Sequence, residues 1–330
     1  MTNPDRPLLP AVQAPADPGL VAAVRLPADR HPAAVYLARL APGSRRAMRG
    51  ALDLVARELT GGRADAASLA WPALRYQHVA AVRARLAERL APPTVNKTLA
   101  AVRGVVREAW RLGLVAAEVH QSIADIQGVR GERLAPGRAL TVRERQKLYE
   151  AAPDGPSGAR DAALLAVLDG CGLRRAEAAA CDLGDADPAA ESLAVRRGKG
   201  GKGRIVPLTN GARDAVRDWL AVRGAAPGPL LCAVAKGGRV KTGARLTTQA
   251  VYNRVRWLAD RAKVARFSPH DFRRTLIGDL LDAGADLATV SAMVGHASVQ
   301  TTARYDRRGE AAKRRAAALR AVPYRSRKSS

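Results

Sequence analysis

The apolar residues of this chain recur at helical spacing, and this pattern is the strongest constraint on its fold. Met48, Leu52, Val55 and Leu59 follow at intervals of four, three and four, behind Ser44, which can cap the helix. Aromatic residues make up only 4% of the chain, so the cores have to be built from Ala, Leu and Val packed between helices. A chain of 330 residues is long enough for two such cores, and we expect two mainly helical domains.

A later predicted helix carries a basic face beside its apolar one. It begins at residue 93 and contains Lys97, and it places Arg103, Arg107 and Arg111 at intervals of four. A basic stripe opposite an apolar stripe suits a helix that lies against DNA, and a solvated surface face is the alternative. Arg103 and Arg107 are therefore candidate DNA contacts.

A break in the helical pattern separates the two domains. Glycine and proline interrupt residues 128–138, where Arg130 and Arg133 keep the segment basic and are two more candidate DNA contacts. Thr141, followed three residues later by Glu144, then forms a capping box that starts a new helix. The second domain is accordingly predicted to begin directly after this basic linker.

The domain boundaries follow from these breaks. Prolines in a polar, alanine-rich setting predict a disordered arm over residues 1–24. Beyond the arm we expect a helical domain over residues 25–127, the basic linker over 128–138, the second domain over 139–322 and a basic tail over 323–330.

One stretch of the second domain changes to strand periodicity. Residues 192–197 and 204–208 flank the run Gly198-Lys199-Gly200, which predicts a β-hairpin with a glycine-rich tip. A lysine at such a tip can reach a reacting phosphate and deliver a proton, and a solvated loop lysine is the alternative. Lys202 lies on the same tip, and chemistry alone does not choose between Lys199 and Lys202.

The charge balance indicates a nucleic-acid partner. Lys and Arg total 55 against 30 acidic residues, a formal net charge of +25, as expected for binding a phosphate backbone. The three cysteines have no paired C-x-x-C spacing, so neither a disulfide framework nor a zinc site is suggested. No stretch approaches the roughly 20 apolar residues of a membrane span, and no secretory signal begins the chain. We expect a cytoplasmic protein with no membrane partner.

Two arginines stand at predicted helix starts in the second domain. Arg174 follows an apolar run that ends at residue 170, and Glu177 lies three residues further on the same side. An arginine at a helix start opposes the helix dipole, which argues against a purely structural placement, although a surface Arg–Glu pair is the alternative. His270 and Arg273 are likewise three residues apart at the start of a later helix, so they share one face.

A histidine and a tyrosine complete the candidate set. Only five histidines occur in the chain, and His296 falls in the same region as His270. Tyr305 follows nine residues after His296 in polar and charged company, where Ser298 can cap a short helix. A tyrosine phenol needs neighbouring cations or a base to become a nucleophile. A plain surface tyrosine is the alternative reading of Tyr305 alone.

Together these residue types fit chemistry on a phosphodiester. Attack on phosphorus builds negative charge on the non-bridging oxygens, which guanidinium, imidazole and ammonium groups can stabilise while exchanging protons, without any metal. The residues that predict DNA strand transfer by a tyrosine are Arg174, Lys199, His270, Arg273, His296 and Tyr305.

The order and spacing of these motifs resemble the tyrosine recombinase family, also called phage integrases, over roughly residues 30 to 321. The resemblance places the same six residues in the catalytic positions. It implies an N-terminal helical core-binding domain and a catalytic domain that is mainly α with a small antiparallel β-sheet, an α+β class. The run Val95-Asn96-Lys97 resembles the core-binding helix of this family, which adds Lys97 to the candidate DNA contacts. Two positions depart from the common pattern: Arg274 stands where many members have a second histidine, and Cys181 stands where a leucine is usual.

The expected mechanism uses no cofactor, metal or ATP. Tyr305 attacks the scissile phosphate and leaves a 3′-phosphotyrosyl bond and a free 5′-hydroxyl, while Arg174 and Arg273 clamp the non-bridging oxygens. Lys199 protonates the leaving 5′-oxygen and His270 assists proton transfer from the phenol. His296 hydrogen-bonds the phosphate.

The expected partner is double-stranded DNA. The resemblance further implies a homo-tetramer on paired DNA sites, with accessory or directionality factors as further candidates. Two alternatives remain open at the level of sequence: a type IB topoisomerase, which relaxes supercoils alone, and a non-catalytic repressor or accessory protein of the same fold. The complete residue set argues against the second alternative.

Overall fold

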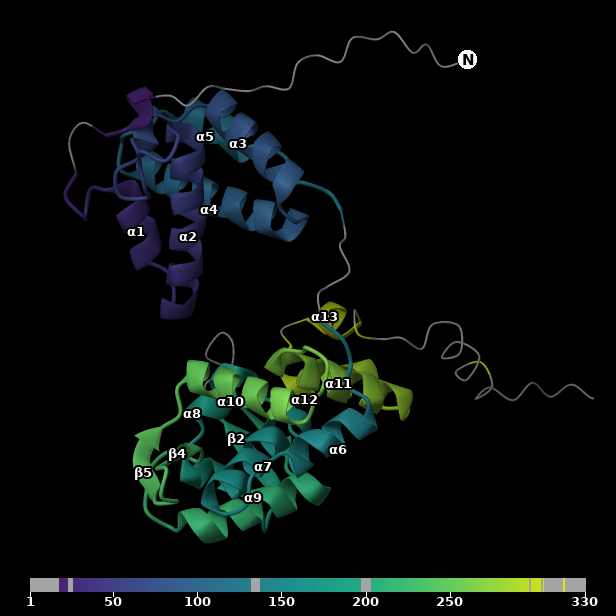
Figure 1. Cartoon of the computed structure of the whole chain (residues 1–330). Coiled ribbons are helices and arrows are strands. Elements are labelled where there is room, and N and C mark those ends of the chain that lie inside the picture. Colours follow the sequence, from purple (N-terminus) through teal and green to yellow (C-terminus); the bar gives the residue numbers. More distant parts are fainter. Residues whose placement is uncertain are drawn as a thin grey trace, which may run out of the picture. The chain divides into compact units, whose positions relative to one another are not determined.

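The computed structural model describes residues 18–22, 26–131, 137–196, 203–296, 298–303, 305 and 317. The chain divides into two compact units, Met1–Ala135 and Pro136–Ser330 (Figure 1). Within the described residues, no helix combines the length and the apolar character needed to cross a membrane.

The first unit is built from helices around one central helix, α4, which contacts α1, α2, α3 and α5. Helices α1, α2 and α4 each carry proline at the first or second position, where its fixed φ angle suits a helix start and its missing N–H is not needed. The helices are α1 (Pro32–Ala38), α2 (Pro42–Thr60), α3 (Tyr76–Arg89), α4 (Pro92–Arg111) and α5 (Ala117–Ala124).

Two local predictions in this unit are wrong. Helix α2 begins at Pro42 with Ala41 as its cap, so Ser44 lies inside the first turn and does not cap it. Residues 18–22 do not belong to a disordered arm: Leu20 is 2% exposed, and its carbonyl accepts a hydrogen bond from Ala70 N at 2.8 Å. Leu20 reaches the core and Val21 packs against it, so burial of these apolar side chains holds the segment in place.

The start of the predicted basic linker is held against the first unit. Asn96 on α4 accepts a hydrogen bond from Val129 N at 2.7 Å and donates one to Val129 O at 3.0 Å. Arg83 on α3 donates to Gln127 O at 2.6 Å and to Gly128 O at 3.2 Å. Side chains on two helices therefore satisfy the backbone of this segment, which has no regular structure of its own.

The second unit combines helices with two small antiparallel sheets, which confirms the predicted fold class. The predicted hairpin is present as β2 (Ser192–Val195) and β3 (Arg204–Pro207), joined at one edge by β1 (Ala186–Asp187). The pairing of β4 (Cys232–Val234) with β5 (Val240–Arg245) was not predicted. The helices are α6 (Val142–Glu150), α7 (Pro156–Asp169), α8 (Arg175–Ala180), α9 (Asn210–Arg223), α10 (Thr248–Arg261), α11 (Pro269–Asp282), α12 (Leu287–Val294) and α13 (Val299–Ala303).

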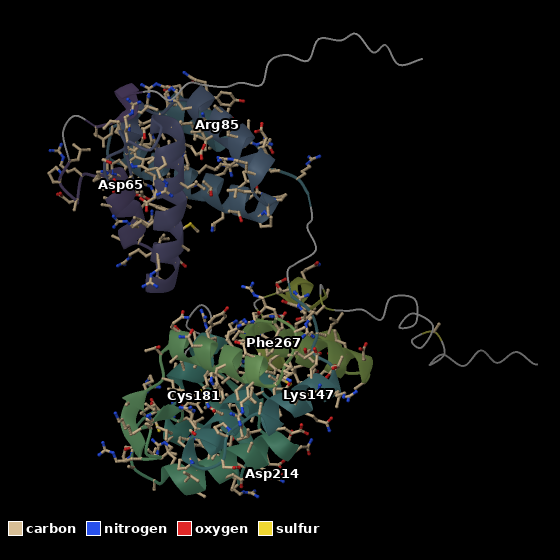
Figure 2. All side chains as sticks on the ribbon, in the orientation of Figure 1. Asp65, Arg85, Lys147, Cys181, Asp214 and Phe267 are labelled. Carbon is tan, nitrogen blue, oxygen red and sulfur yellow. The ribbon has the colours of Figure 1, made fainter. Side chains whose placement is uncertain are left out.

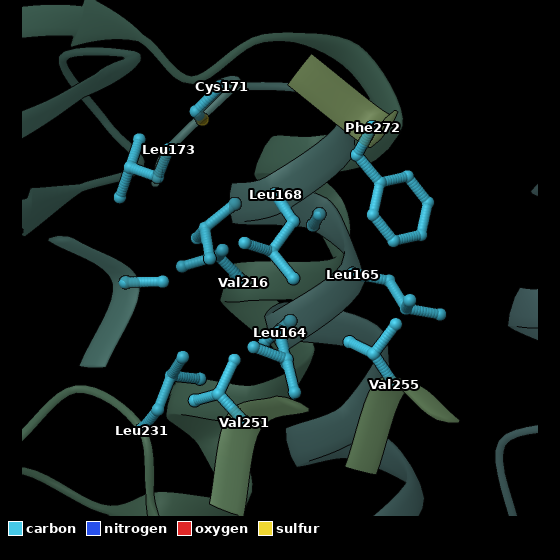
Figure 3. Close-up of a cluster of buried hydrophobic side chains, with 14 of the residues drawn as sticks. Leu164, Leu165, Leu168, Cys171, Leu173, Val216, Leu231, Val251, Val255 and Phe272 are labelled. Atoms are coloured by element: carbon cyan, nitrogen blue, oxygen red, sulfur yellow. The ribbon is translucent and has the colours of Figure 1, made fainter. Parts of the chain in front are cut away.

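Helix α7 forms the centre of the second unit. It contacts α6, α8, α9, α10 and α11, and its apolar residues face all sides, as expected of a buried helix. Leu164, Leu165 and Leu168 are fully buried between Val216 of α9 and Val255 of α10 on neighbouring elements (Figure 3). This core fixes the positions of α8 and α11, which pack directly against α7.

The three cysteines are buried free thiols. Cys181 lies at the end of α8 (Figure 2). Burial raises the pKa of both Cys171 and Cys181 to about 12, so these thiols stay protonated at neutral pH. Their part in the fold is therefore that of small apolar side chains.

The packing of α7 predicts which glycine cannot be replaced. A Cβ at Gly158 would overlap the carbonyl oxygen of Pro153, which is backbone and cannot move aside, whereas a Cβ at exposed Gly211 on α9 meets nothing within 4 Å. We expect Gly158→Ala to lower the free energy of unfolding by about 1–3 kcal/mol or more. Gly211→Ala should leave it unchanged or slightly raised. Urea unfolding of both variants measures this, and equal stabilities would contradict it.

Candidate active site

Glu177 is bonded by two arginines of the second unit, Arg174, which the sequence predicts as a site residue, and Arg204, which it does not. Arg174, the cap residue of α8, donates through Nη1 to Glu177 Oε1 at 2.6 Å and through Nη2 to Gly295 O at 2.9 Å. Arg204, the first residue of β3, grips both oxygens of the same carboxylate at 3.1 and 2.9 Å and donates through Nε to Met293 O at 3.0 Å. One carboxylate thus joins α8, the hairpin and the end of α12.

Glu177 stays ionised despite its burial. Its side chain is 4% exposed, and burial by itself would raise the pKa of the carboxyl group. Hydrogen bonds from Arg204 and from Arg174 outweigh that effect and hold the pKa of Glu177 at about 2. The carboxylate is therefore a fixed negative charge that orients two guanidinium groups.

Gly295 permits the close approach of these segments. It ends α12 with a φ of 66°, in the left-handed region that favours glycine. A Cβ at this position would lie 3.0 Å from the guanidinium of Arg204. Because Gly295 has no side chain, the Arg204 side chain can pack against its backbone. Gly295 O accepts the hydrogen bond from Arg174.

Arg273 on α11 is the most deeply buried cation of the set, with 1% of its surface exposed. It donates to Gly172 O at 2.7 Å and also to Val294 O. Burial, followed by repulsion from Arg174, lowers the pKa of Arg273 to about 9, so the guanidinium is still charged at neutral pH. It ties the turn that precedes Arg174 to the turn that precedes His296.

The two histidines have different partners. Nδ1 of His296 lies 2.8 Å from the Oγ1 of Thr302, a fully buried residue of α13. Burial, with Arg273 and Arg174 as the next causes, lowers the pKa of His296 to about 4, so its imidazole is neutral at pH 7. Burial and the charge of Arg273 also lower the pKa of His270. Neutral imidazoles can accept a proton or a hydrogen bond.

Tyr305 is brought to this cluster by the short helix α13. Nε2 of His270 lies 3.2 Å from the phenol oxygen of Tyr305. The Tyr305 ring stacks on His296, with the ring centroids 6.1 Å apart. The ring is also partly buried against Ile277 and Val290 on α11 and α12. A neutral base within hydrogen-bonding distance of a hydroxyl is the pairing that activates a nucleophile.

Five of the six predicted residues therefore lie in one described site, on α8, α11, α12 and α13 and the turns beside them. Figure 1 shows α11, α12 and α13 side by side. Lys199 and its alternative Lys202 lie outside the described residues, so their place in the site stays a prediction. The strands that lead to that tip are described, and Val195 pairs with Arg204 at its base.

Sequence reasoning missed two residues of this site, Arg204 and Thr302. Arg204 was assigned only to a strand, and Thr302 only to the helix before the tyrosine. Neither belongs to a local pattern, because each meets its partner across more than one element. The available signal was weak: an arginine at the start of a strand that follows a lysine-bearing tip.

The predicted DNA contacts of the first unit have different fates. Lys97, Arg107 and Arg130 are exposed. Arg103 is half-buried and donates to Ile126 O, so it holds the start of the linker segment in place. Arg103 thus has a structural partner that the stripe pattern did not predict, and Arg133 lies outside the described residues.

Comparison with known proteins bears on the identity of this chain. A family model described as the phage integrase family matches residues 138–311, which is more than half of the chain. The chain belongs to the phage integrase family. Its relatives include a tyrosine recombinase XerC of Pseudomonas putida, 34% identical over 237 residues that make up 71% of this chain and 76% of the relative. A tyrosine recombinase XerD of Mycobacterium tuberculosis is 36% identical over 226 residues, 66% of this chain and 70% of that protein.

Solved structures of the family share the fold at low identity. A lambda integrase dimer bound to a core site has a TM-score of 0.63 and 16% identity, covering 85% of this chain and 94% of that chain. A lambda integrase tetramer bound to a Holliday junction has a TM-score of 0.61 and 15% identity, with coverage of 84% and 75%. Like its XerC and XerD relatives, this chain is a tyrosine-recombinase enzyme.

The buried carboxylate of this recombinase gives a direct test of Arg204. Arg204→Met leaves Glu177 with Arg174 as its remaining described guanidinium partner, and removing one member of a buried pair destabilises by about 3–5 kcal/mol. Ionised Glu177 contributes stability above its usual pKa of 4.5 and loses it as the pH falls toward 2. The difference in the free energy of unfolding between wild type and Arg204→Met should therefore shrink as the pH falls from 4.5 toward 2. Urea unfolding over this pH range measures it.

The matched control is Arg213→Met, which removes an arginine paired with exposed Glu191 and Asp214. Exposed ion pairs add little stability because water and salt screen them, so this variant should unfold nearly as wild type at every pH. Equal losses in the two variants would contradict the role given to Glu177.

Proposed function

We propose that this chain is a site-specific DNA recombinase that cleaves and rejoins duplex DNA through a 3′-phosphotyrosyl bond at Tyr305. The observation that carries the proposal is the 3.2 Å approach of His270 Nε2 to the Tyr305 hydroxyl, within a group of arginines. A neutral imidazole can take the phenol proton as the oxygen attacks phosphorus. The 5′-oxygen of the DNA leaves with its bonding electrons and receives a proton, so the step balances without an added reactant.

The cations have separate tasks in this mechanism. Arg174, whose side chain is 25% exposed, has the open position from which a guanidinium can bind non-bridging oxygens. Arg273 reinforces the same electrostatic field from beneath, since its donors already hold two backbone carbonyls. His296 hydrogen-bonds the phosphate, with Thr302 on its other nitrogen holding the ring in place.

Lys199 is proposed as the general acid that protonates the leaving 5′-oxygen. Arg204, five residues further along the chain, is hydrogen-bonded to Glu177 and to Met293 O. The strand residue next to the hairpin tip is therefore anchored at the site. The bond energy of the phosphodiester is retained in the phosphotyrosine. Reversal by the 5′-hydroxyl of another strand therefore needs no ATP and no metal.

The proposed substrate is duplex DNA, contacted in part by the exposed cations Lys97, Arg107 and Arg130 of the first unit. We further propose a homo-tetramer on paired sites, with accessory or directionality factors as further partners. Support comes from the net charge of +25 and from the lambda integrase tetramer on a Holliday junction, whose fold this chain shares. The bacterial relatives favour a location with the chromosome in the cytoplasm.

The nucleophile is tested by removing one oxygen. Tyr305→Phe should bind the DNA that flanks the gene as well as wild type does, but form no covalent adduct on a nicked duplex that traps cleavage. Tyr252, whose ring centre lies 5.6 Å from the guanidinium carbon of Arg175, supplies the control: Tyr252→Phe should still form the adduct. Denaturing gel electrophoresis with peptide mapping decides, and an adduct in the Tyr305→Phe protein would transfer the role to another residue.

Strand exchange distinguishes a recombinase from a topoisomerase with the same site. With two cognate sites on one plasmid, wild type should give inverted or excised products, and mass photometry should detect four protomers on the paired DNA. A topoisomerase would relax the plasmid efficiently as a monomer and give no recombinant product from any site pair. A non-catalytic DNA-binding protein would give neither product. Either of these last results would overturn the proposal.

A further inference from the structure

Arg274 is the residue of α11 that departs from the common family pattern, and it lies against the nucleophile. Its guanidinium carbon is 5.5 Å from the centre of the Tyr305 ring. Its side chain is only 16% exposed, so the contact is not a loose surface one. A guanidinium within about 6 Å of an aromatic ring is attracted by the electrons of its face.

Other contacts hold this guanidinium in position. Arg274 Nη1 donates to Gly137 O at 3.3 Å, and its Nε lies 3.6 Å from Asp271 Oδ1. Asp271 is itself 2% exposed and accepts hydrogen bonds from Ser268 N at 2.8 Å and from Arg138 N at 3.1 Å. The cation is therefore placed by a buried carboxylate and a backbone carbonyl before any DNA binds.

A guanidinium supplies something at this position that a histidine does not. His270, one turn earlier on α11, has a lowered pKa because of burial and the charge of Arg273. An imidazole with its ordinary pKa of about 6.5 is mostly neutral at pH 7. A guanidinium remains charged under these conditions.

We propose that Arg274 is a positioning residue for the nucleophile, which holds the Tyr305 ring and stabilises the negative charge that the phenol oxygen carries as it enters and leaves the phosphotyrosyl bond. The proposal rests on the proposed function of Tyr305. Charge on the oxygen spreads into the ring, so a cation against the ring attracts the phenolate more strongly than the neutral phenol. Arg274 acts through Tyr305 and needs no contact with the DNA.

A purely structural role is the competing explanation, because Arg274 also holds the backbone of Gly137. The two roles respond differently to the acidity of the phenol. Replacing Tyr305 by 3-fluorotyrosine makes the phenol more acidic and adds little volume, so it lessens the need for a cation near the ring. It does nothing for a lost anchor at Gly137.

The test measures the single-turnover rate of covalent adduct formation by the full-length protein on the nicked duplex, at saturating protein. Arg274→Met should slow this rate roughly tenfold, with DNA affinity unchanged. Arg274→Lys, which keeps the charge, should recover most of the rate. With 3-fluorotyrosine at position 305, the ratio of the rates of adduct formation between the protein with Arg274 and the Arg274→Met variant should fall severalfold.

Arg261→Met is the matched control, because Arg261 makes the same type of contact, 5.4 Å from the Trp257 ring centre, in another part of the unit. It should cleave as wild type does. If Arg274→Met does not fold, as judged by circular dichroism, the neutral variant Arg274→Gln takes its place in the same comparison.

Three results would overturn the inference while leaving the proposed function intact. They are a wild-type rate for the neutral variant, equal losses for the Lys and Met variants, and an unchanged gap with 3-fluorotyrosine. If wild type itself forms no adduct and matches Tyr305→Phe, the proposed function fails and the inference fails with it.

Discussion

The interaction on which the site depends is the grip of Arg273 on two backbone carbonyls. Its buried guanidinium donates to Gly172 O and Val294 O, which precede Arg174 and His296 by two residues each. Burying this cation is unfavourable, as the lowering of its pKa to about 9 shows. The unfavourable term is offset because the two carbonyls would otherwise lack partners in the core. This cross-link adds to the hydrogen bond from Arg174 to Gly295 O in joining the segments that carry Arg174 and His296.

The positive charge gathered by this arrangement is balanced from one side. Glu177 neutralises part of the charge on Arg174 and Arg204 and remains ionised, with a pKa of about 2. The two imidazoles of His270 and His296 avoid adding to the repulsion, because burial and the neighbouring arginines keep them neutral at pH 7. The free protein is thus left with an excess of cations facing Tyr305, a field that favours an entering phosphate.

Residues far apart in the chain also meet at Asp271, next to His270. Its carboxylate caps α11 through Ser268 and accepts a hydrogen bond from Arg138, at the start of the second unit. It lies beside Arg274, whose guanidinium contacts the Tyr305 ring. The end of the predicted basic linker is therefore attached to the same turn of helix that carries the proposed base.

The sequence by itself determined the helical character of both units and the hairpin at residues 192–208. It also named Arg174, His270, Arg273, His296 and Tyr305 as candidates, and their catalytic roles are proposals. These features are set by local periodicity, by caps and by short spacings, which a single segment carries without its neighbours. The start of α2 is set locally by Pro42, a signal that the assignment of Ser44 as the cap overlooked. The order of residues 18–22 and the structural use of Arg103 were not accessible in this way, because each depends on a distant partner. Only the tertiary structure decided that Arg204 and Arg174 bond the same carboxylate of Glu177. The same is true of the contact of Thr302 with His296 and of Arg274 with the Tyr305 ring. The physical reason is that long side chains find partners by three-dimensional proximity and burial and not by spacing along the chain.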